Sequence, residues 1–322
     1  MARSDRLGAR PLAALVLDRP VALARLRDGR VIALEDRCPH RQAPLSSGCI
    51  TDSGLACPHH GWTFGEGGEP RVLPGLPADQ AMPALRARAH AVREHDGLVW
   101  LRLGEGAAEL PALVRALQPA QRRYLWQSPG PAHVIDAMEN FLDPLHTHSV
   151  HPGLVRRGGE RQPVLATLSA TDEGFAVDYR GQAEQSGLLY HLFESPCVCE
   201  RAWFAAPGSA QIEYRYANGS EARITLHFTP RTVDSTEVFA TLHVSGRWAP
   251  AWAVRCFVWP LLRRVGEQDR AMLSLQSANR RHFPGRGDAS TALDLVRPAL
   301  ARFWSEGQLP DPSDDHTTAL ML

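Results

Sequence analysis

The amino-acid sequence predicts an α+β protein, in which an N-terminal all-β domain precedes a larger domain with an antiparallel sheet flanked by helices. Residues 20–100 consist of short apolar, strand-like runs separated by turn residues. Residues 162–244 contain segments in which polar and apolar side chains alternate, as in strands with one buried face. Residues 132–149 and 252–282 have helical character. We expect the last dozen residues to be frayed.

The chain length and one polar segment predict two domains. A chain of 322 residues exceeds the usual size of a single hydrophobic core. A polar, proline-containing stretch opens at Gly104 and ends near Pro119. We therefore expect residues 1–108 to form the first domain and residues 109–322 the second.

Charge and cysteine content exclude several classes of protein. Lysine plus arginine equals aspartate plus glutamate, at 35 each. Without a basic stripe, the chain lacks the electrostatic footprint of a nucleic-acid-binding protein. The apolar stretch around Arg255 is too short and too interrupted to span a membrane. Six cysteines are too few for a disulfide scaffold. We therefore expect a cytoplasmic protein with no nucleic-acid or membrane partner.

Two pairs of cysteine and histidine lie close together in the first domain. Cys38 and His40 stand two residues apart, and Cys57 is followed by the adjacent His59 and His60. Thiolates can hold one iron of a [2Fe-2S] unit while imidazoles hold the other, which raises the reduction potential of the cluster. A Cys2His2 zinc site is the alternative, because it needs the same four donor atoms. The Cys-x-His spacing is unusual for a zinc finger and favours iron–sulfur.

A second cluster packs three histidines and two carboxylates into fourteen residues. On a helix, Asp143 and His146 share a face, whereas His148 points away and is the weaker candidate ligand. His151 precedes Pro152 and is therefore pushed out of the α region, so a helix that ends there can bring His151 back toward His146. A solvated helix with buried structural histidines is the alternative, and the density of the cluster favours a metal site.

Both clusters resemble motifs of the Rieske non-haem iron oxygenases. Residues 12–103 resemble the Rieske domain of ring-hydroxylating oxygenases, although Gln42 occupies a position where that family usually has glycine. The Cys-x-x-His spacing of the family selects His60 over His59. The resemblance implies a Rieske [2Fe-2S] cluster with four ligands: Cys38, His40, Cys57 and His60.

The pattern Asn-x-x-Asp-x-x-His-x-x-x-x-His resembles the mononuclear iron motif of the same oxygenases. It implies an Fe(II) bound by His146, His151 and one carboxylate far downstream, the set that leaves open positions on the iron. In the family this acid precedes a glutamine by seven residues, which selects Asp269, seven before Gln276. Glu267 is the alternative third ligand.

The resemblance also implies how electrons reach the iron. In the family, the counterpart of Asp143 links a Rieske histidine of a neighbouring subunit to a histidine that binds the iron, so Asp143 is the expected bridge. This path requires a head-to-tail homotrimer. No Gly-x-Gly-x-x-Gly fingerprint follows a strand. We therefore expect a separate reductase that uses flavin and NAD(P)H, with or without a ferredoxin.

The predicted activity is oxygenation with O2. The short chain most resembles the subgroup that includes vanillate and dicamba demethylases and relatives of pheophorbide oxygenase. This favours monooxygenation or O- or N-demethylation of a small aromatic or cyclic substrate over arene cis-dihydroxylation. A non-catalytic electron-transfer protein that uses only the Rieske domain is the alternative from another class.

Three cysteines and four aromatic residues complete the predictions. Cys49 is expected to be a small buried hydrophobic residue, and Cys197 and Cys199 are not expected to bind metal. The substrate cavity should be lined from the sheet and the C-terminal helices, where a cluster of aromatic residues is explained equally well by core packing. The cluster comprises Trp248, Trp252, Phe257 and Trp259.

Overall fold

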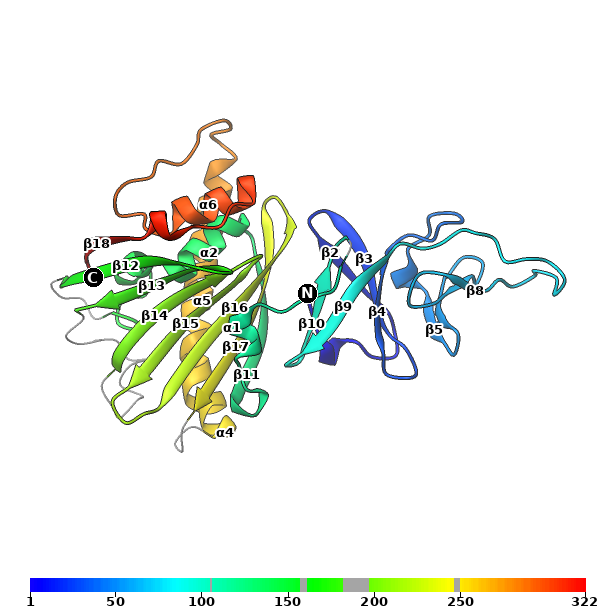
Figure 1. Ribbon diagram of the computed structural model, residues 1–322, viewed down its shortest axis with the longest axis horizontal. Helices are drawn as coiled ribbons and strands as arrows, with labels where there is room; N and C mark the ends of the chain where they lie inside the picture. The colour runs from blue at the N-terminus through cyan, green and yellow to red at the C-terminus, as the bar shows by residue number, and fades with distance from the viewer. Residues whose placement is uncertain (105, 157–160, 182–196, 246–249) are drawn as a thin grey trace. The chain divides into compact units, whose positions relative to one another are not determined.

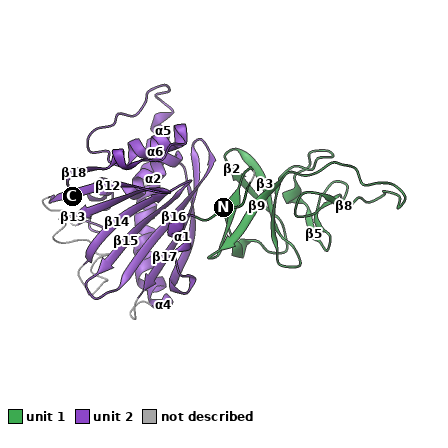
Figure 2. Ribbon diagram, in the orientation of Figure 1, with its two compact units in different colours: residues 1–110 green, residues 111–322 purple. Residues whose placement is uncertain are grey.

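The computed structural model describes residues 1–104, 106–156, 161–181, 197–245 and 250–322. The chain forms two compact units, Met1–Leu110 and Pro111–Leu322, which are described separately (Figures 1 and 2). In the described parts of the chain, no helix combines the length and the apolar content needed to cross a membrane.

The first unit consists of two antiparallel sheets. The six-stranded sheet has the order β1-β10-β9-β4-β3-β2, and the four-stranded sheet has the order β5-β6-β7-β8. Short turns join β2 to β3, β3 to β4 and β9 to β10. At the turn after β3, Gly29 has a φ of 90°, which glycine adopts without strain. The strands are β1 (Ala2–Arg3), β2 (Leu12–Val16), β3 (Arg19–Arg25), β4 (Val31–Glu35), β5 (Cys49–Thr51), β6 (Gly54–Ala56), β7 (Thr63–Phe64), β8 (Pro70–Val72), β9 (Ala89–His95) and β10 (Leu98–Arg102). The all-β prediction for this part of the chain is confirmed.

Buried aliphatic and aromatic side chains form the core between these sheets. Leu34, Leu45, Leu55 and Phe64 are each fully buried, and they belong to the same apolar cluster as the thiols of Cys38 and Cys57. Two short 3-10 turns, η1 (Ser4–Arg6) and η2 (Leu45–Ser47), complete the unit.

The second unit is built on an eight-stranded antiparallel sheet with the order β11-β17-β16-β15-β14-β13-β12-β18. In the described part of residues 162–244, the alternation arises because successive side chains point to opposite faces of this sheet. The strands are β11 (Arg122–Gly130), β12 (Pro163–Thr171), β13 (Gly174–Arg180), β14 (Cys197–Ala205), β15 (Ser209–Tyr216), β16 (Glu221–Thr232), β17 (Ser235–Ser245) and β18 (His316–Met321).

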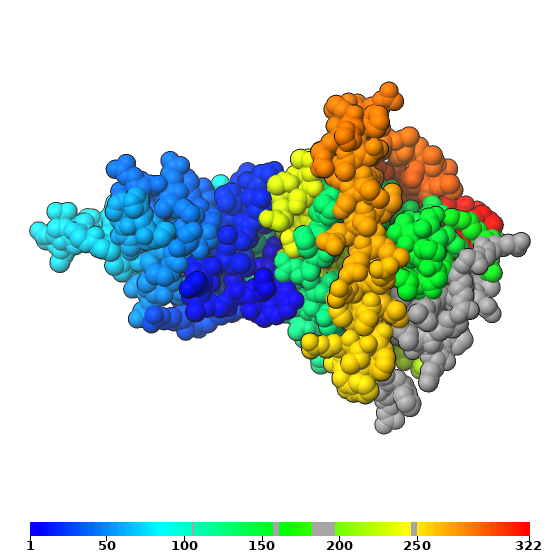
Figure 3. All heavy atoms as spheres, turned by 180° about the vertical axis from the view of Figure 1, so that it is seen from behind, coloured from blue at the N-terminus to red at the C-terminus, as the bar shows by residue number. Residues whose placement is uncertain are grey.

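Helices cover one face of this sheet and enclose the main core. Helix α2 packs against strands β14 to β17 and against α5 and α6, and α5 runs across the unit in the space-filling view (Figure 3). Met138 on α2, Phe175 and Phe204 on the sheet, and Leu300 on α6 are at most 1% exposed. The helical segments are α1 (Ala112–Arg115), η3 (Pro119–Gln121), α2 (Val134–Leu142), η4 (Pro144–His146), α3 (Thr147–Val150), α4 (Ala251–Ala253), the π-helical η6 (Val254–Val258), α5 (Trp259–Arg280), α6 (Arg297–Glu306) and η7 (Pro312–Asp314).

Two local predictions are wrong. The stretch 132–149 is not one helix: Asp143 adopts an extended conformation, with φ −93° and ψ 116°, because the following Pro144 disfavours the α region. Asp143 and His146 therefore do not share a helical face. The C-terminus is not frayed either, because β18 pairs with β12 and buries Leu320 and Leu322 in the main core.

A buried ion-pair network holds α2 to the end of α5 and to α6. Asp136 on α2 is 4% exposed. Its Oδ1 accepts one hydrogen bond from Nη2 of Arg280 and one from Nη1 of Arg297, each at 3.1 Å. Both arginines also reach Asp288, whose side chain is 43% exposed. Because Asp136 is buried and Asp288 is exposed, the two aspartates should contribute differently to the free energy of unfolding.

We expect Asp136→Ala to lower the free energy of unfolding by about 3 kcal/mol, because it removes the buried carboxylate that Arg280 and Arg297 share. Asp288→Ala removes a solvent-exposed partner of the same arginines and should cost under about 1 kcal/mol. Urea unfolding followed by tryptophan fluorescence measures both values. Equal losses in the two variants would contradict a buried role for Asp136.

Candidate metal centres

Two similar loops carry the cysteines and histidines of the first unit. The loop after β4 is closed by hydrogen bonds from the amide of Gln42 to the carbonyl of Cys38 and from the amide of Cys38 to the carbonyl of Ala43, both 2.8 Å. The loop after β6 repeats this arrangement, because the amide of Gly61 donates to the carbonyl of Cys57. Each loop therefore carries one cysteine and at least one histidine on a hydrogen-bonded turn.

Gln42 lies in the left-handed region, with a φ of 61°. This conformation is strained for a residue with a Cβ atom and is ordinary for glycine. The backbone of the loop thus explains why glycine suits this position, and it shows that the loop forms even when glutamine replaces it.

The thiols and the imidazoles of the first unit face different environments. Cys38 and Cys57 are 1% and 4% exposed, whereas His60 is exposed and His40 is half-buried. The ring centroids of His40 and His60 are 4.8 Å apart, and His40 stacks on Trp62 at 4.5 Å. The two thiols are therefore buried and the two imidazoles more accessible. This mixed set fits a [2Fe-2S] cluster in which thiolates hold one iron and imidazoles hold the other.

The surroundings of the Cys38 thiol disfavour its thiolate form. Burial raises the pKa of the Cys38 thiol, and the neighbouring Cys57 thiol raises it further. His59 also lies close to His60, with ring centroids 3.9 Å apart. Bound iron would stabilise the thiolate forms that burial disfavours.

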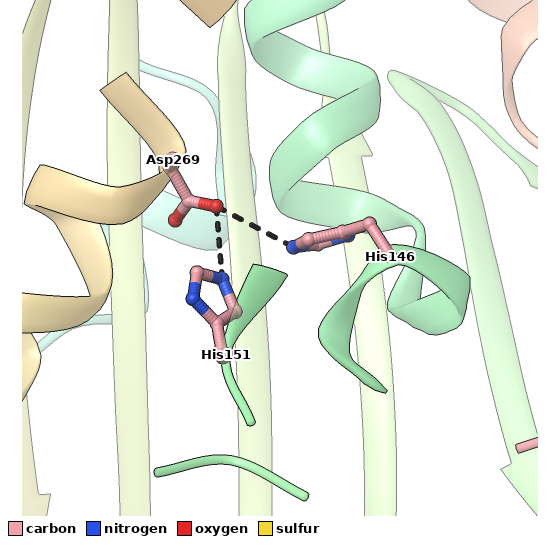
Figure 4. A group of neighbouring side chains, drawn as sticks. All are labelled: His146, His151 and Asp269. Carbon is pink, nitrogen blue, oxygen red and sulfur yellow. Dashed lines mark ion pairs between the residues drawn. The ribbon is translucent and has the colours of Figure 1, made fainter. Parts of the chain in front are cut away.

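In the second unit, three side chains from three helical segments converge (Figure 4). His146 comes from η4, His151 follows the C-terminus of α3, and Asp269 lies on α5. One potential ligand atom of each lies within 4.8 Å of the others, and no other such group of three occurs among the described residues. The carboxylate Oδ1 of Asp269 is 2.9 Å from Nε2 of His151 and 3.5 Å from Nε2 of His146.

The side chains of His151 and Asp269 are arranged like two ligands directed at one cation. Nε2 of His151 and Oδ1 of Asp269 are both buried, yet neither forms a well-directed hydrogen bond to any described residue. Buried polar atoms normally have a partner. Two imidazoles and one carboxylate are the donor set of mononuclear non-haem iron, so the residues fit that metal.

Helix ends orient the two imidazoles. The side chain of Asp143 accepts a hydrogen bond from the amide of Leu145 at 2.9 Å and thereby caps η4. The carbonyl of Asp143 is 2.6 Å from Nδ1 of His146, so Nε2 of that ring faces Asp269. His151 has φ −119° and ψ 48°, which confirms that the residue before Pro152 leaves the α region.

The electrostatics of this site favour an ionised carboxylate. Burial alone raises the pKa of Asp269, but His146, His151 and the side chain of Asn140 outweigh it, and the pKa falls to about 2. Burial raises the pKa of Asp143, which the amide of Leu145 only partly offsets. The carboxylate of Asp269 is therefore ionised at neutral pH.

Other candidate residues lie outside this group of three. Glu267 forms an ion pair with Arg263 at 2.8 Å, and its side chain is 40% exposed. His148 belongs to no group of metal-ligating side chains among the described residues. Cys49 is exposed, so its prediction as a buried residue is wrong: it begins the edge strand β5.

The second pair of cysteines shows no metal site. Cys197 and Cys199 lie at the start of β14, where the Sγ of Cys197 is 3.3 Å from the carbonyl of Cys199. Burial raises the pKa of the Cys197 thiol to about 11, so the thiolate is disfavoured. Neither cysteine belongs to a metal-ligating group within the part of the chain that the structure describes.

Comparison with known proteins identifies the two units. Residues 1–87 match the Rieske [2Fe-2S] domain. Residues 132–303, more than half of the chain, match the vanillate O-demethylase oxygenase C-terminal domain. The chain belongs to the family of Rieske non-haem iron oxygenases. The predicted family, the α+β fold and the two cofactors, a Rieske [2Fe-2S] cluster and a mononuclear iron, are thereby confirmed.

Individual relatives of this Rieske oxygenase align over part of their length. The oxygenase component of dicamba O-demethylase from Stenotrophomonas maltophilia is 36% identical over 152 residues, 46% of this chain and 44% of the relative. The vanillate O-demethylase oxygenase subunit of Pseudomonas sp. (strain HR199 / DSM 7063) is 30% identical over 177 residues, 54% and 48% of the two chains. The aligned region spans less than half the length of these curated relatives.

Solved structures share the fold of this Rieske oxygenase. Dicamba monooxygenase bound to dicamba matches with a TM-score of 0.76 at 22% identity, covering 94% of this chain and 93% of that chain. NdmA of Pseudomonas putida CBB5 with caffeine matches with a TM-score of 0.77 at 21% identity, covering 95% and 88%.

A cavity of about 600 Å³ lies beside the three converging side chains of this Rieske oxygenase. Strands β15 to β17 line it with the side chains of one sheet face, while α2 and α5 close the other side. The lining is mainly apolar and aromatic, which suits an organic ring rather than a polar chain. The cavity includes Trp126, Phe141, Tyr214, Tyr216, Ile224, Leu226, Phe228, Leu242, Trp259 and Leu262.

The prediction for the aromatic cluster is partly wrong. Trp259 lines the cavity and stacks on Tyr124 at 4.3 Å. Trp252 and Phe257 are instead 65% and 60% exposed, and Trp248 lies outside the described residues. The contributions of Trp126, Tyr214 and other strand residues were missed, because alternation reveals a buried face but not which part of that face borders a cavity.

The two candidate carboxylates can be distinguished by metal content. Asp269→Asn should lower the iron content from about three to about two per protomer, because only the cluster irons remain. Glu267→Gln should leave it near three, since that side chain pairs with Arg263 in solvent. Iron analysis combined with the visible spectrum of the cluster measures this. A loss of iron in the glutamine variant alone would transfer the assignment to Glu267.

Proposed function

We propose that this chain is an oxygenase component that uses O2 and externally supplied electrons to monooxygenate, or to O- or N-demethylate, a small aromatic or cyclic substrate. The observation that carries the proposal is the convergence of His146, His151 and Asp269 beside a cavity of about 600 Å³. A carrier of electrons alone would need neither the ligand set nor a cavity beside it. The matched family domains support the same class of reaction.

In this proposal each cofactor has its own ligands. Cys38, His40, Cys57 and His60 would hold the [2Fe-2S] cluster, and His146, His151 and Asp269 would hold the mononuclear iron. When bound, the cluster supplies single electrons and the iron activates O2.

The remaining groups of the site bind and orient. The apolar cavity would hold a ring next to the metal-binding group and exclude water from it. Asp269 contributes a fixed negative charge, and the carbonyl of Asp143 holds the ring of His146 in one orientation. Asp143 would serve as the bridge for electrons between subunits of a homotrimer.

Demethylation is favoured over cis-dihydroxylation by the character of the relatives. Proteins named as dicamba, vanillate and methylxanthine demethylases align with this chain, and these names describe oxidation of methyl groups on ring substrates. By the same reasoning, a flavin- and NAD(P)H-dependent reductase, with or without a ferredoxin, would supply the electrons. The proposed site of action is the cytoplasm.

The substrate class can be tested by product analysis. Purified protein with a surrogate reductase and NADH should release formaldehyde from some members of a panel of aryl methyl ethers and N-methylated heterocycles. Formation of a cis-diol from an arene, without formaldehyde, would instead assign dioxygenation. Consumption of NADH without oxygenated product from any ring substrate would count against the substrate class proposed.

His146→Ala should abolish turnover while the brown Rieske cluster and its EPR signal persist, because the substitution removes a ligand of the mononuclear iron only. Leu165→Ala changes a residue of β12 that is 54% exposed and serves as a control for substitution in the same unit. Turnover that survives in His146→Ala at the wild-type rate would refute the assigned iron site.

A further inference from the structure

Two consecutive residues of α5 lie close to the two ring nitrogens of His151. Its Nε2 is 2.9 Å from Oδ1 of Asp269, and its Nδ1 is 3.0 Å from Oε1 of Gln268. The ring is 1% exposed, so each ring nitrogen depends mainly on protein groups for its polar contacts. The position of one helix therefore determines what both nitrogens of this imidazole can do.

A histidine that binds metal through Nε2 must carry its remaining proton on Nδ1. That N–H is buried here, and a buried donor without an acceptor is costly. The amide oxygen of Gln268 is the acceptor at the right distance. In the opposite orientation, the amide nitrogen of Gln268 would donate to Nδ1 and force the proton onto Nε2, which blocks metal binding.

The two imidazoles of the site differ in this respect. Nδ1 of His146 faces the backbone carbonyl of Asp143 at 2.6 Å, an acceptor that no side-chain substitution removes. Nδ1 of His151 depends on the side chain of Gln268. Only the tautomer of His151 is therefore open to control by a single residue.

We propose that Gln268 is a positioning residue that accepts the Nδ1 proton of the metal-binding tautomer of His151 and fixes the plane of its ring. This inference rests on the proposed function, because it concerns a ligand of the mononuclear iron. Gln268 acts only through His151, and its neighbour Asp269 supplies the adjoining ligand from the same turn of α5. Outer-shell partners of this kind typically change metal affinity by about 10- to 100-fold.

Gln268→Leu tests the proposal, because leucine keeps the approximate volume and removes the acceptor. We expect its affinity for Fe(II), measured by competition with a chelator, to fall by about 10- to 100-fold. Gln268→Glu retains an acceptor oxygen and should bind Fe(II) at least as tightly as the wild type. Gln308→Leu and Gln308→Glu make the same chemical changes at an exposed glutamine of the same unit and serve as controls.

A second measurement reports the tautomer without activity. In protein loaded with Zn(II) at this site, ¹⁵N NMR of histidine should show the His151 proton on Nδ1 in the wild type and in Gln268→Glu. Gln268→Leu should lose the signature of a hydrogen-bonded Nδ1–H. Urea unfolding followed by tryptophan fluorescence verifies that the second unit of each variant is folded, because the Rieske cluster reports only on the first unit.

Two outcomes would overturn the proposal. Wild-type affinity for Fe(II) in Gln268→Leu would show that the acceptor is dispensable, and an equal loss in Gln268→Leu and Gln268→Glu would show a packing role. Failure of the proposed iron site gives a different result, because His146→Ala would then also bind Fe(II) with wild-type affinity. If only the Gln268 proposal fails, His146→Ala still loses affinity for Fe(II).

Discussion

A largely buried carboxylate next to one buried and one half-buried imidazole requires a compensating positive charge, and the second unit is organised around this requirement. Asp269 is ionised beneath an apolar cavity, because its surroundings lower its pKa to about 2. Isolated buried charge is costly, and removing its partner is strongly destabilising. The three converging side chains come from separate helical segments, so they remain close only if those segments are held firmly together.

The rest of the unit supplies that rigidity. The eight-stranded sheet provides a flat apolar face on which α2 and α5 rest. Asp136 joins the helix that leads into the histidine motif to the far end of the helix that carries Asp269, through Arg280. The same sheet face lines the cavity, so one structural layer both supports the metal-binding group and encloses the space for a substrate.

Much of the architecture follows from local sequence pattern, and the misses have physical causes. Alternation predicted the large sheet, and the proline after His151 predicted its departure from helical geometry. Pro144 breaks the helix at Asp143 by the same effect, but the helical pattern on both sides of the break predicted one continuous helix. The C-terminal strand β18 has no strong pattern of its own; it forms because β12 offers an unpaired edge and the core accepts Leu320.

The sequence by itself determined the family, the two cofactors and a short list of candidate ligands, because donor types at fixed spacings are local properties of the chain. Tertiary structure decided between the two carboxylates that the sequence had left open, since α5 directs Asp269 toward the histidines and Glu267 toward Arg263. It also decided which strand residues line the cavity and placed Gln268 beside His151. Contacts between residues more than a hundred positions apart depend on how helices pack on the sheet, and no local pattern encodes that packing.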